Sequence, residues 1–272
     1  MEYLKISDLI AKRLSPQVDG LRLQFYESKN NIGIRYFYID NLLPLKIANE
    51  SAEAFPEKSV MRLMNSFREK KYTSKSLSRF KPIISEVTFA FQAPEVINLV
   101  EGITGFKNQK ADVSLYAGGL SAMEKGHFLG PHIDNSHDGS RKYYRTLNLL
   151  YYVSPNWLPQ SGGHLELWGS DVNSKITIES VFNRLVVMET NSSSWHSVSR
   201  VLEDGVRQCV SNYYFSTESP SGEAYFHVTE FSAPLNRPFL RFLGWADGRL
   251  RNLVRLIKRD GFSKKDIYIE VD

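Results

Sequence analysis

Short apolar runs separated by turn residues fill the middle of the chain between residues 111 and 216, and no helix-like pattern interrupts them. Runs of this kind are typical of an all-β sandwich or barrel, because strands joined directly by turns must pair with one another. Residues 144–153 are almost continuously apolar, which predicts a strand buried on both faces. The segments expected to form strands are 111–116, 128–133, 144–153, 163–168, 175–178, 185–189, 195–201 and 206–216.

The N-terminal part of the chain mixes helix-like and strand-like patterns. Residues 3–14 predict a short amphipathic helix, and residues 21–28 and 32–39 predict two strands joined by a turn at 29–31. A helix is then expected to begin around 40–44, where a proline falls in the first turn, and to end near residue 55.

Between this part and the β-rich segment, residues 57–81 are rich in Lys, Arg and Ser. They suggest a loosely ordered loop with a helical piece at 59–67, and the basic residues are interpreted as a solvated surface. Residues 83–91 and 94–103 carry apolar residues at helical spacing, with Gly105 beyond the second segment. Both helices are expected to pack against the outside of a sheet.

The last part of the chain, beyond residue 217, has a different character. Residues 247–259 place leucine, valine and isoleucine at helical spacing among several arginines. A basic amphipathic helix of this kind can lie on a membrane surface or bind a partner. The simpler interpretation is a helix docked on the core with solvated arginines, and the role of this segment stays open.

Composition limits the class of protein. The chain has 272 residues and 42% hydrophobic content, enough for a buried core in one larger domain with additions. A net charge of +4, from 34 basic and 30 acidic residues, is too mild to predict nucleic-acid binding. Cys209 is the only cysteine, which excludes an intramolecular disulfide and a thiolate zinc site and favours a packed small hydrophobe.

The N-terminal residues lack the continuous apolar stretch of a signal peptide, and no window reaches the roughly 18 apolar residues of a membrane span. We therefore expect no transmembrane segment and a cytoplasmic protein. The oligomeric state cannot be read from the sequence.

One pair of residues in the β-rich segment has the spacing of metal ligands. His132 and Asp134 are separated by one residue, so on a strand their side chains leave the same face. His196 begins a later strand-like run, and a rolled sheet would bring it opposite the pair. Two imidazoles and one carboxylate on one side of a metal leave other positions open, as in non-haem Fe(II) oxygenases. Each residue taken singly could equally be a surface or core residue.

A single arginine, Arg207, follows these residues on the last predicted strand. Its guanidinium offers a planar fork that matches a carboxylate, and its apolar neighbours favour a buried position over a surface one.

The residues that form this pattern carry a resemblance to a known family. They are His132-x-Asp134, the run from Arg145 to Tyr152, Trp157, Gly162-Gly163, His196 and Arg207. Together they resemble the core of the Fe(II)/2-oxoglutarate-dependent dioxygenases, in particular the prolyl 4-hydroxylase-like branch. The resemblance is densest from residue 116 to residue 215.

The resemblance implies a mainly β fold with flanking helices. Its core would be a double-stranded β-helix, or jelly roll, at residues 111–217. Residues 1–110 would supply N-terminal helices and strands that buttress the core, and residues 218–272 a C-terminal extension with the basic amphipathic helix. The three parts would form one structural domain.

The resemblance also assigns roles to individual residues. His132, Asp134 and His196 would hold Fe(II), and Arg207 would bind 2-oxoglutarate. Tyr152, with Tyr116 as a second candidate, would hydrogen-bond the same cosubstrate. Arg145 and Trp195 would contact the substrate. The implied cofactors are Fe(II), 2-oxoglutarate and O2, with ascorbate as a supporting reductant.

The reaction implied is hydroxylation of an unactivated C–H, coupled to oxidative decarboxylation of 2-oxoglutarate to succinate. A carboxylate at Asp134 favours a hydroxylase over the halogenating members, which have a small residue there. The substrate could be a prolyl residue, or a small molecule or glycan in a biosynthetic pathway. A nucleic-acid substrate is not expected, because the second arginine of those relatives is absent after Arg207.

Two other classes of protein remain as alternatives. One is a non-catalytic jelly-roll binding module that engages a partner through the basic helix. The other is a cupin-like isomerase or dioxygenase that binds metal without 2-oxoglutarate; such proteins usually present more histidines near the first pair.

Overall fold

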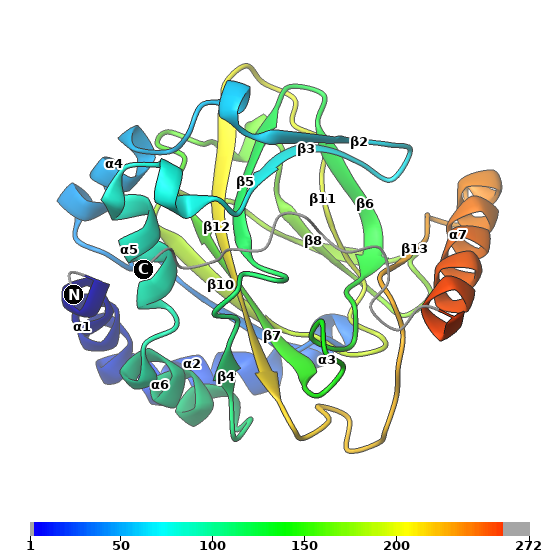
Figure 1. Ribbon diagram of the computed structural model, residues 1–272, viewed down its shortest axis with the longest axis horizontal. Coiled ribbons are helices and arrows are strands. Elements are labelled where there is room, and N and C mark those ends of the chain that lie inside the picture. Colours follow the sequence, from blue (N-terminus) through cyan, green and yellow to red (C-terminus); the bar gives the residue numbers. More distant parts are fainter. Residues whose placement is uncertain (1–2, 258–272) are drawn as a thin grey trace.

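A curled, antiparallel β-sheet forms the centre of the protein, and the computed structural model describes residues 3–257 of the chain (Figure 1). Helices cover one side of the sheet, and a single long helix stands at the opposite end. The strands are β1 (Tyr36–Ile39), β2 (Arg62–Asn65), β3 (Glu69–Ser74), β4 (Lys110–Ala111), β5 (Gly119–Glu124), β6 (Phe128–Ile133), β7 (Tyr144–Tyr152), β8 (Leu165–Trp168), β9 (Lys175–Ile178), β10 (Arg184–Glu189), β11 (His196–Val198), β12 (Val206–Ser216) and β13 (Glu230–Phe231).

The order of the strands shows how the sheet curls. In the described part of the chain the order is β1-β10-β7-β12-β5-β3-β6-β11-β8-β9, while β13 pairs with β6, β2 with β3 and β4 with β12. β3 pairs with β5 through Tyr72–Ser74 and with β6 through Glu69 and Lys70, so it connects the two layers. This arrangement, with flanking helices, confirms the predicted jelly-roll core.

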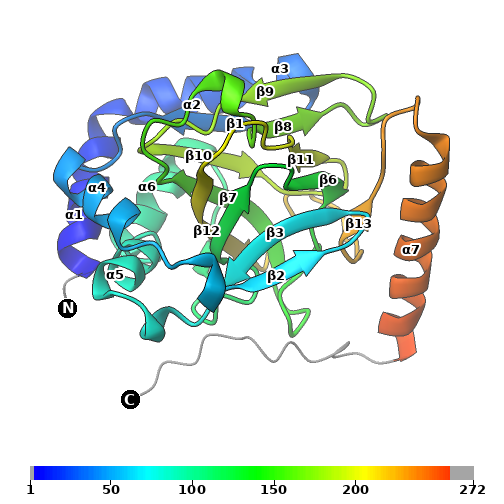
Figure 2. The ribbon, with the colours of Figure 1, turned by 90° about the horizontal axis from the view of Figure 1, so that it is seen from above.

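The helices on the covered side lie between the N-terminus and β5. They are α1 (Tyr3–Leu14), α2 (Val18–Glu27), α3 (Lys29–Ile32), α4 (Leu45–Glu53), α5 (Pro82–Ala90) and α6 (Pro94–Thr104), with short 3-10 turns at Ser15–Gln17, Lys58–Val60 and Leu77–Arg79. A further 3-10 turn, Pro159–Ser161, lies between β7 and β8. Except for α3, their apolar faces share one core cluster with residues of β1, β5, β7, β10 and β12, including Leu147, Leu149, Val187 and Val210. Figure 2 shows α1, α4, α5 and α6 gathered at one side of the strands. They buttress one layer of the jelly roll, as the sequence predicted.

Several elements have the predicted bounds or nearly so. The N-terminal helix, the helices α5 and α6 and the strands β6, β7, β9, β10 and β12 agree with the prediction to within one or two residues. Gly105 caps α6 in the left-handed region, with φ 74°, and its N–H donates to the Glu101 carbonyl. Each of these segments has a strong periodic pattern and a clear end signal.

The predicted strand at residues 21–28 is wrong, because this segment is α2. Leu21, Phe25 and Ser28 are buried at helical spacing, and α2 packs against α6 and β1. Of the strand predicted at residues 32–39, only β1 forms, and it pairs with β10 instead of forming a hairpin. An apolar run of this length has no period that separates helix from strand, so the tertiary contacts decide.

The prediction for residues 57–81 is also wrong. A hairpin of β2 and β3 replaces the expected loop and helical piece, and it joins the main sheet through β5 and β6.

The strand predicted at 111–116 ends at Ala111, and β5, which no prediction contained, begins at Gly119. The Asp112 carboxylate accepts hydrogen bonds from the N–H groups of Tyr116, Ala117 and Gly118, which stabilises a turn between the two strands.

The C-terminal helix α7 (Pro238–Ile257) is longer than the predicted helix at its N-terminal end, and residues 258 and 259 of that prediction lie outside the described residues. No described helix is long and apolar enough to span a membrane on its own; α5 and α6, bent by 41°, meet the length and composition criteria only as a pair.

Candidate metal and cosubstrate site

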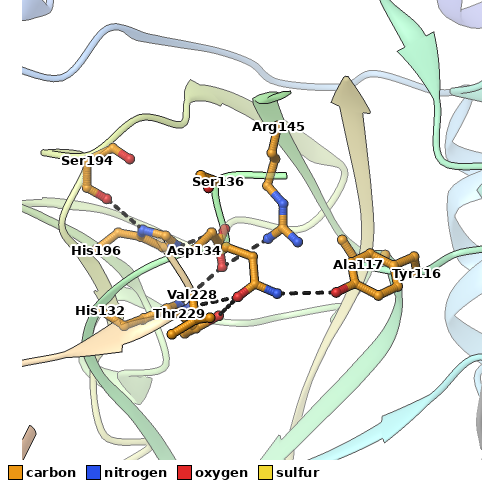
Figure 3. Close-up of polar contacts among 12 residues, drawn as sticks. Tyr116, Ala117, His132, Asp134, Ser136, Arg145, Ser194, His196, Val228 and Thr229 are labelled. Atoms are coloured by element: carbon orange, nitrogen blue, oxygen red, sulfur yellow. Dashed lines mark hydrogen bonds and ion pairs between the residues drawn. The ribbon is translucent and has the colours of Figure 1, made fainter. Parts of the chain in front are cut away.

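Pairing between β6 and β11 brings together the histidines that are far apart in the sequence. His196 lies directly opposite His132 in the antiparallel register, and the centroids of the two rings are 4.2 Å apart. Asp134 follows directly after β6, on the same side as His132 (Figure 3). The three predicted metal ligands therefore meet at one point, at the end of two paired strands.

The ligand atoms of these residues lie within 4.8 Å of one another. His132 Nε2 is 3.7 Å from Asp134 Oδ1, and His196 Nε2 is 3.7 Å from Asp134 Oδ2. Each histidine donates its Nδ1–H to a backbone carbonyl, that of Gly130 at 3.0 Å or that of Ser194 at 2.9 Å. This fixes the tautomer and leaves both Nε2 lone pairs facing the carboxylate, as in protein metal sites.

The carboxylate of Asp134 is almost fully buried and ionised. Burial alone would raise its pKa, but Arg145, whose Nη1 lies 3.3 Å from Oδ1, and then the two histidines hold the pKa below its ordinary value. Asp134 Oδ2 is buried and has no hydrogen-bond partner among residues 3–257. An ionised oxygen without a partner at this position fits a metal ion.

His132 is also suited to metal binding. Burial, and next the charge of His196, lower the pKa of His132 to about 3, so its imidazole is neutral at physiological pH. Phe231 of β13 stacks on its ring at 5.3 Å. Two imidazole nitrogen donors and one carboxylate on one side match the ligand set of a non-haem Fe(II) site with open positions.

Arg207 lies on β12 and lines the same cavity as His132, Asp134 and His196. Its side chain is 3% exposed, its Nε donates to the Gly163 carbonyl at 3.0 Å, and Nη1 lies 3.5 Å from Ser121 Oγ. Its guanidinium also lies 4.8 Å from the centre of the Tyr152 ring. Arg207 forms no ion pair with any carboxylate of the described chain. A buried, unpaired guanidinium is costly, and an anionic ligand would compensate it.

A turn with two glycines holds the Gly163 carbonyl beneath Arg207. Gly162 has φ +70°, and a Cβ there would lie 2.1 Å from the Arg200 carbonyl oxygen. Gly163 has φ +68°, and a Cβ there would meet the side chain of Arg207 at 3.3 Å. Any other residue would be strained at either position, so the glycine pair in the motif positions Arg207.

A cavity of about 580 Å³ connects the two groups. His132, Asp134, His196, Arg145 and Arg207 all line it. This one cavity therefore has room for a metal, a small dicarboxylate and part of a substrate.

Three predicted residues do not line this cavity. Tyr152 lies beneath Arg207; burial raises its pKa to about 12, and its hydroxyl has no well-formed hydrogen bond in the described structure. Tyr116 accepts a hydrogen bond from Asn135 Nδ2 at 3.4 Å (Figure 3). Trp195 contributes its carbonyl to the Trp168 N–H in the β-rich core.

Two further histidines of the β-rich segment, His164 and His137, lie outside the cluster. His164 is buried, and its Nε2 lies 2.7 Å from the Pro159 carbonyl. His137 packs against Tyr144 and Phe226 at the loop beyond Asp134.

Sequence reasoning missed Ser121, Asn148 and Tyr213, which also line the cavity. Asn148 lies in the middle of β7, and its Oδ1 is buried without a hydrogen bond to any described residue. Burial, and next the charge of Asp134, raise the pKa of Tyr213 well above its ordinary value. A polar residue inside a strand that is otherwise apolar was the signal available for Asn148.

Comparison with known proteins places this site in a class. Residues 118–215, which include the three clustered residues and Arg207, match the family model of the 2OG-Fe(II) oxygenase superfamily. No curated protein matches the chain significantly. The protein is thus an oxygenase with Fe(II) and 2-oxoglutarate as its cofactors, which confirms the enzyme class and cofactors predicted from the sequence.

Within that class, solved structures define the branch of the fold. A prolyl hydroxylase from Trichoplax adhaerens, solved in complex with a hypoxia-inducible-factor peptide, superimposes with a TM-score of 0.53 at 18% identity, covering 77% of this chain and 96% of its own. A prolyl 4-hydroxylase from Pseudomonas putida gives 0.53 at 15% identity, covering 72% and 98%. The fold is therefore that of the prolyl 4-hydroxylase-like branch.

An enzyme that catalyses a different reaction has a similar fold. The non-haem alpha-ketoglutarate-dependent epimerase SnoN from nogalamycin biosynthesis gives a TM-score of 0.50 at 13% identity, covering 83% of this chain and 89% of its own. The fold alone therefore does not determine the reaction or the substrate.

Proposed function

We propose that the protein hydroxylates an unactivated C–H bond of its substrate and couples this to oxidative decarboxylation of 2-oxoglutarate to succinate. His132, Asp134 and His196 bind Fe(II) through the two Nε2 atoms and a carboxylate oxygen. Arg207 binds the distal carboxylate of 2-oxoglutarate. When bound, Fe(II) and 2-oxoglutarate supply the chemistry that activates O2 and breaks the C–H bond.

The observation that carries the proposal is the convergence of three ligand atoms within 4.8 Å, with both Nδ1 atoms engaged by backbone carbonyls. A packed core histidine has no need of this arrangement, and a buried carboxylate oxygen without a hydrogen bond is unfavourable unless a cation occupies the site.

The other residues of the chain bind and orient the reactants. Arg207 fixes one end of the cosubstrate, with Tyr152 supporting the guanidinium from below and Ser121 beside it. Arg145 keeps the Asp134 carboxylate ionised and oriented, and it lines the side of the cavity open to a substrate. Tyr116 and Trp195 are weaker candidates, because neither lines the cavity.

The substrate is a prolyl residue or, as the second candidate, a small molecule or glycan of a biosynthetic pathway. The prolyl hydroxylase likeness supports the first, while the polar and basic cavity lining supports the second. A non-catalytic binding module is disfavoured, because such a protein does not require the metal-ligand cluster of His132, Asp134 and His196 together with the buried Arg207. We also propose that residues 1–110, 111–217 and 218–272 act as one domain.

Anaerobic titration of the Fe(II)-loaded protein with 2-oxoglutarate tests the proposal, because the chelate gives a weak visible charge-transfer band. We expect the band in the wild type and its loss in His132→Ala. His137→Ala is the matched control, since His137 lies outside the cluster, and it should keep the band. Folded, iron-loaded wild type without a band would exclude the proposed function.

A further inference from the structure

The C-terminal helix α7 docks on β13 through one of its faces. A Cβ at Gly244 would lie 2.3 Å from the Phe231 carbonyl oxygen, so only glycine permits this approach. Gly248, one turn further along, is also buried, and a Cβ there would lie 3.5 Å from Glu230 Cγ. The backbone of α7 therefore lies directly against the strand along this face.

Polar contacts hold the same face in place. The Asp247 carboxylate accepts a hydrogen bond from Arg68 Nη1 at 2.6 Å and lies 2.9 Å from Arg251 Nε. Asn252 Nδ2 lies 3.3 Å from Glu230 Oε1. Because close packing and paired charges both fix the rotation of the helix, the face of α7 that points away from β13 is defined as well.

That outer face of α7 is apolar and exposed. The exposed fractions of its large side chains are 70% for Phe239, 60% for Phe242, 62% for Leu250 and 55% for Leu253. At 3.6 residues per turn, these four positions fall within about 80° of arc, on the side opposite the two docked glycines. We call them the apolar stripe. A helix on a protein surface normally turns polar residues outward, so a contiguous exposed stripe of this kind marks an interaction surface.

One edge of the apolar stripe carries an aromatic and a basic side chain. Trp245 is 57% exposed, and its ring centre lies 5.9 Å from that of Phe242. The Arg249 guanidinium lies 5.6 Å from the Trp245 ring centre. Tryptophan, with an apolar body and one polar N–H, is typical of the boundary between an apolar phase and water.

The charge that accompanies the apolar stripe is positive. Residues 237–259 contain six arginines and one lysine but a single acidic residue, Asp247. That aspartate belongs to the docked face, where it pairs with Arg68. Arg237 and Arg249 are exposed. The outer face therefore combines large apolar side chains with cations, which complements an anionic surface that has an apolar interior.

The place of α7 in the fold favours a flat surface as its partner. Figures 1 and 2 show α7 standing alone at the end of the molecule opposite α1, α4 and α5, so the apolar stripe runs along a ridge. Pairing with a second copy of the chain would bring the positive charges of two such helices together, which opposes a dimer. Arginines along the length of α7 are unfavourable in the centre of a bilayer but not at its surface.

We propose that α7 binds the protein to the surface of an anionic membrane. The apolar stripe enters the boundary between headgroups and acyl chains, while the arginines meet the lipid phosphates. This function is independent of the chemistry at the cavity.

Co-sedimentation of the full chain with vesicles tests the proposal. We expect binding to phosphatidylcholine vesicles that contain about 30% phosphatidylglycerol, and at least tenfold weaker binding to pure phosphatidylcholine. Partitioning should fall as salt is added, because the charges involved are exposed. Failure to bind the anionic vesicles, or equal binding to both kinds, would overturn the proposal.

Variants of exposed apolar residues separate α7 from the rest of the surface. Phe242→Ser combined with Trp245→Ser should lower partitioning at least tenfold. Leu23→Ser combined with Leu45→Ser is the matched control, because these residues are 59% and 64% exposed but lie on α2 and α4. Equal partitioning of both double variants would exclude the apolar stripe as the binding surface, and so would a stable dimer in solution that only the α7 variant dissociates.

A second pair of variants tests the charges. Arg237→Gln combined with Arg249→Gln should weaken binding to the anionic vesicles about tenfold or more. Lys12→Gln combined with Lys46→Gln removes the same net charge from exposed positions on α1 and α4 and should leave binding within about twofold of wild type. Equal losses in the two variants would indicate attraction by net charge alone and would contradict a role for α7.

Tryptophan fluorescence reports which face meets the lipid. Among the four tryptophans, all of which lie within residues 3–257, Trp245 alone is classed as exposed. Anionic vesicles should shift the emission to shorter wavelength, and brominated acyl chains should quench it. Trp245→Phe should still bind but lose both signals. Binding of wild type without either signal would show that another face meets the membrane and would overturn the proposal.

Discussion

Replacing Arg207 by methionine separates its effect on folding from its effect on the cosubstrate. Arg207 is 3% exposed and meets the Gly163 carbonyl and the Tyr152 ring, but no carboxylate in the part of the chain described. A buried, unpaired charge costs several kcal/mol, whereas the hydrogen bond and the cation–π contact together return about 2–3 kcal/mol. We therefore expect the free energy of unfolding of the cosubstrate-free protein to stay within about 2 kcal/mol of wild type, or to rise.

The effect on binding should be much larger. Each charged hydrogen bond to the cosubstrate contributes about 1.5–3 kcal/mol, so loss of a two-bond clamp weakens 2-oxoglutarate binding by about 100-fold or more. At a cosubstrate concentration of 100 times the wild-type Kd, wild type gains about 2.7 kcal/mol, or about 5–10 °C in Tm. At that concentration Arg207→Met should gain about 0.4 kcal/mol, or about 1 °C.

Thermal unfolding of the Mn(II)-loaded protein with and without 2-oxoglutarate measures both quantities. Arg200→Met is the control for a loss of arginine away from the cavity, and it should keep the full cosubstrate-dependent rise in Tm. A full rise in Arg207→Met would refute the assigned role of this residue.

Three further predictions concern pH, the core and the docked helix. The folded-state pKa of His132, about 3, lies below the ordinary value of 6.5, so an unfolded chain binds a proton that the fold excludes. As the pH is lowered from 6.5 to 3, the free energy of unfolding of the metal-free protein should fall by up to about 1.4 kcal/mol per pH unit. In urea titrations, His132→Gln should lack this component of the pH dependence. Phe25→Ala should cost about 3–5 kcal/mol in urea unfolding, because Phe25 is fully buried, whereas Leu23→Ala on the exposed side of α2 should cost less than about 0.5 kcal/mol; equal costs would contradict the assigned packing. Gly244→Ala should separate α7 from β13 and speed limited proteolysis within α7, while Gly102→Ala, with open space around its Cβ position, should leave the cleavage rate unchanged.

The metal pair shows what local sequence determines. Because side chains on a strand alternate, His132 and Asp134 share a face whatever the rest of the chain does. The same holds for α1, α5 and α6, whose periodic apolar residues and end signals define them without tertiary information. Strong local periodicity of this kind could be predicted, and so could the family to which the motif belongs.

Register and packing decided the rest. Only the pairing of β6 with β11 places His196 opposite His132, and only the curl of the sheet brings Arg207 to the same cavity. The local pattern of residues 21–28 is compatible with a strand, and packing against α6 selects the helix α2. Lys71 and Lys75, which the sequence analysis interpreted as part of a solvated surface, line the cavity instead, because β3 pairs with both β5 and β6. A single sequence specifies which face a side chain leaves, but what that face meets depends on long-range contacts, and these set the chemistry of the substrate side.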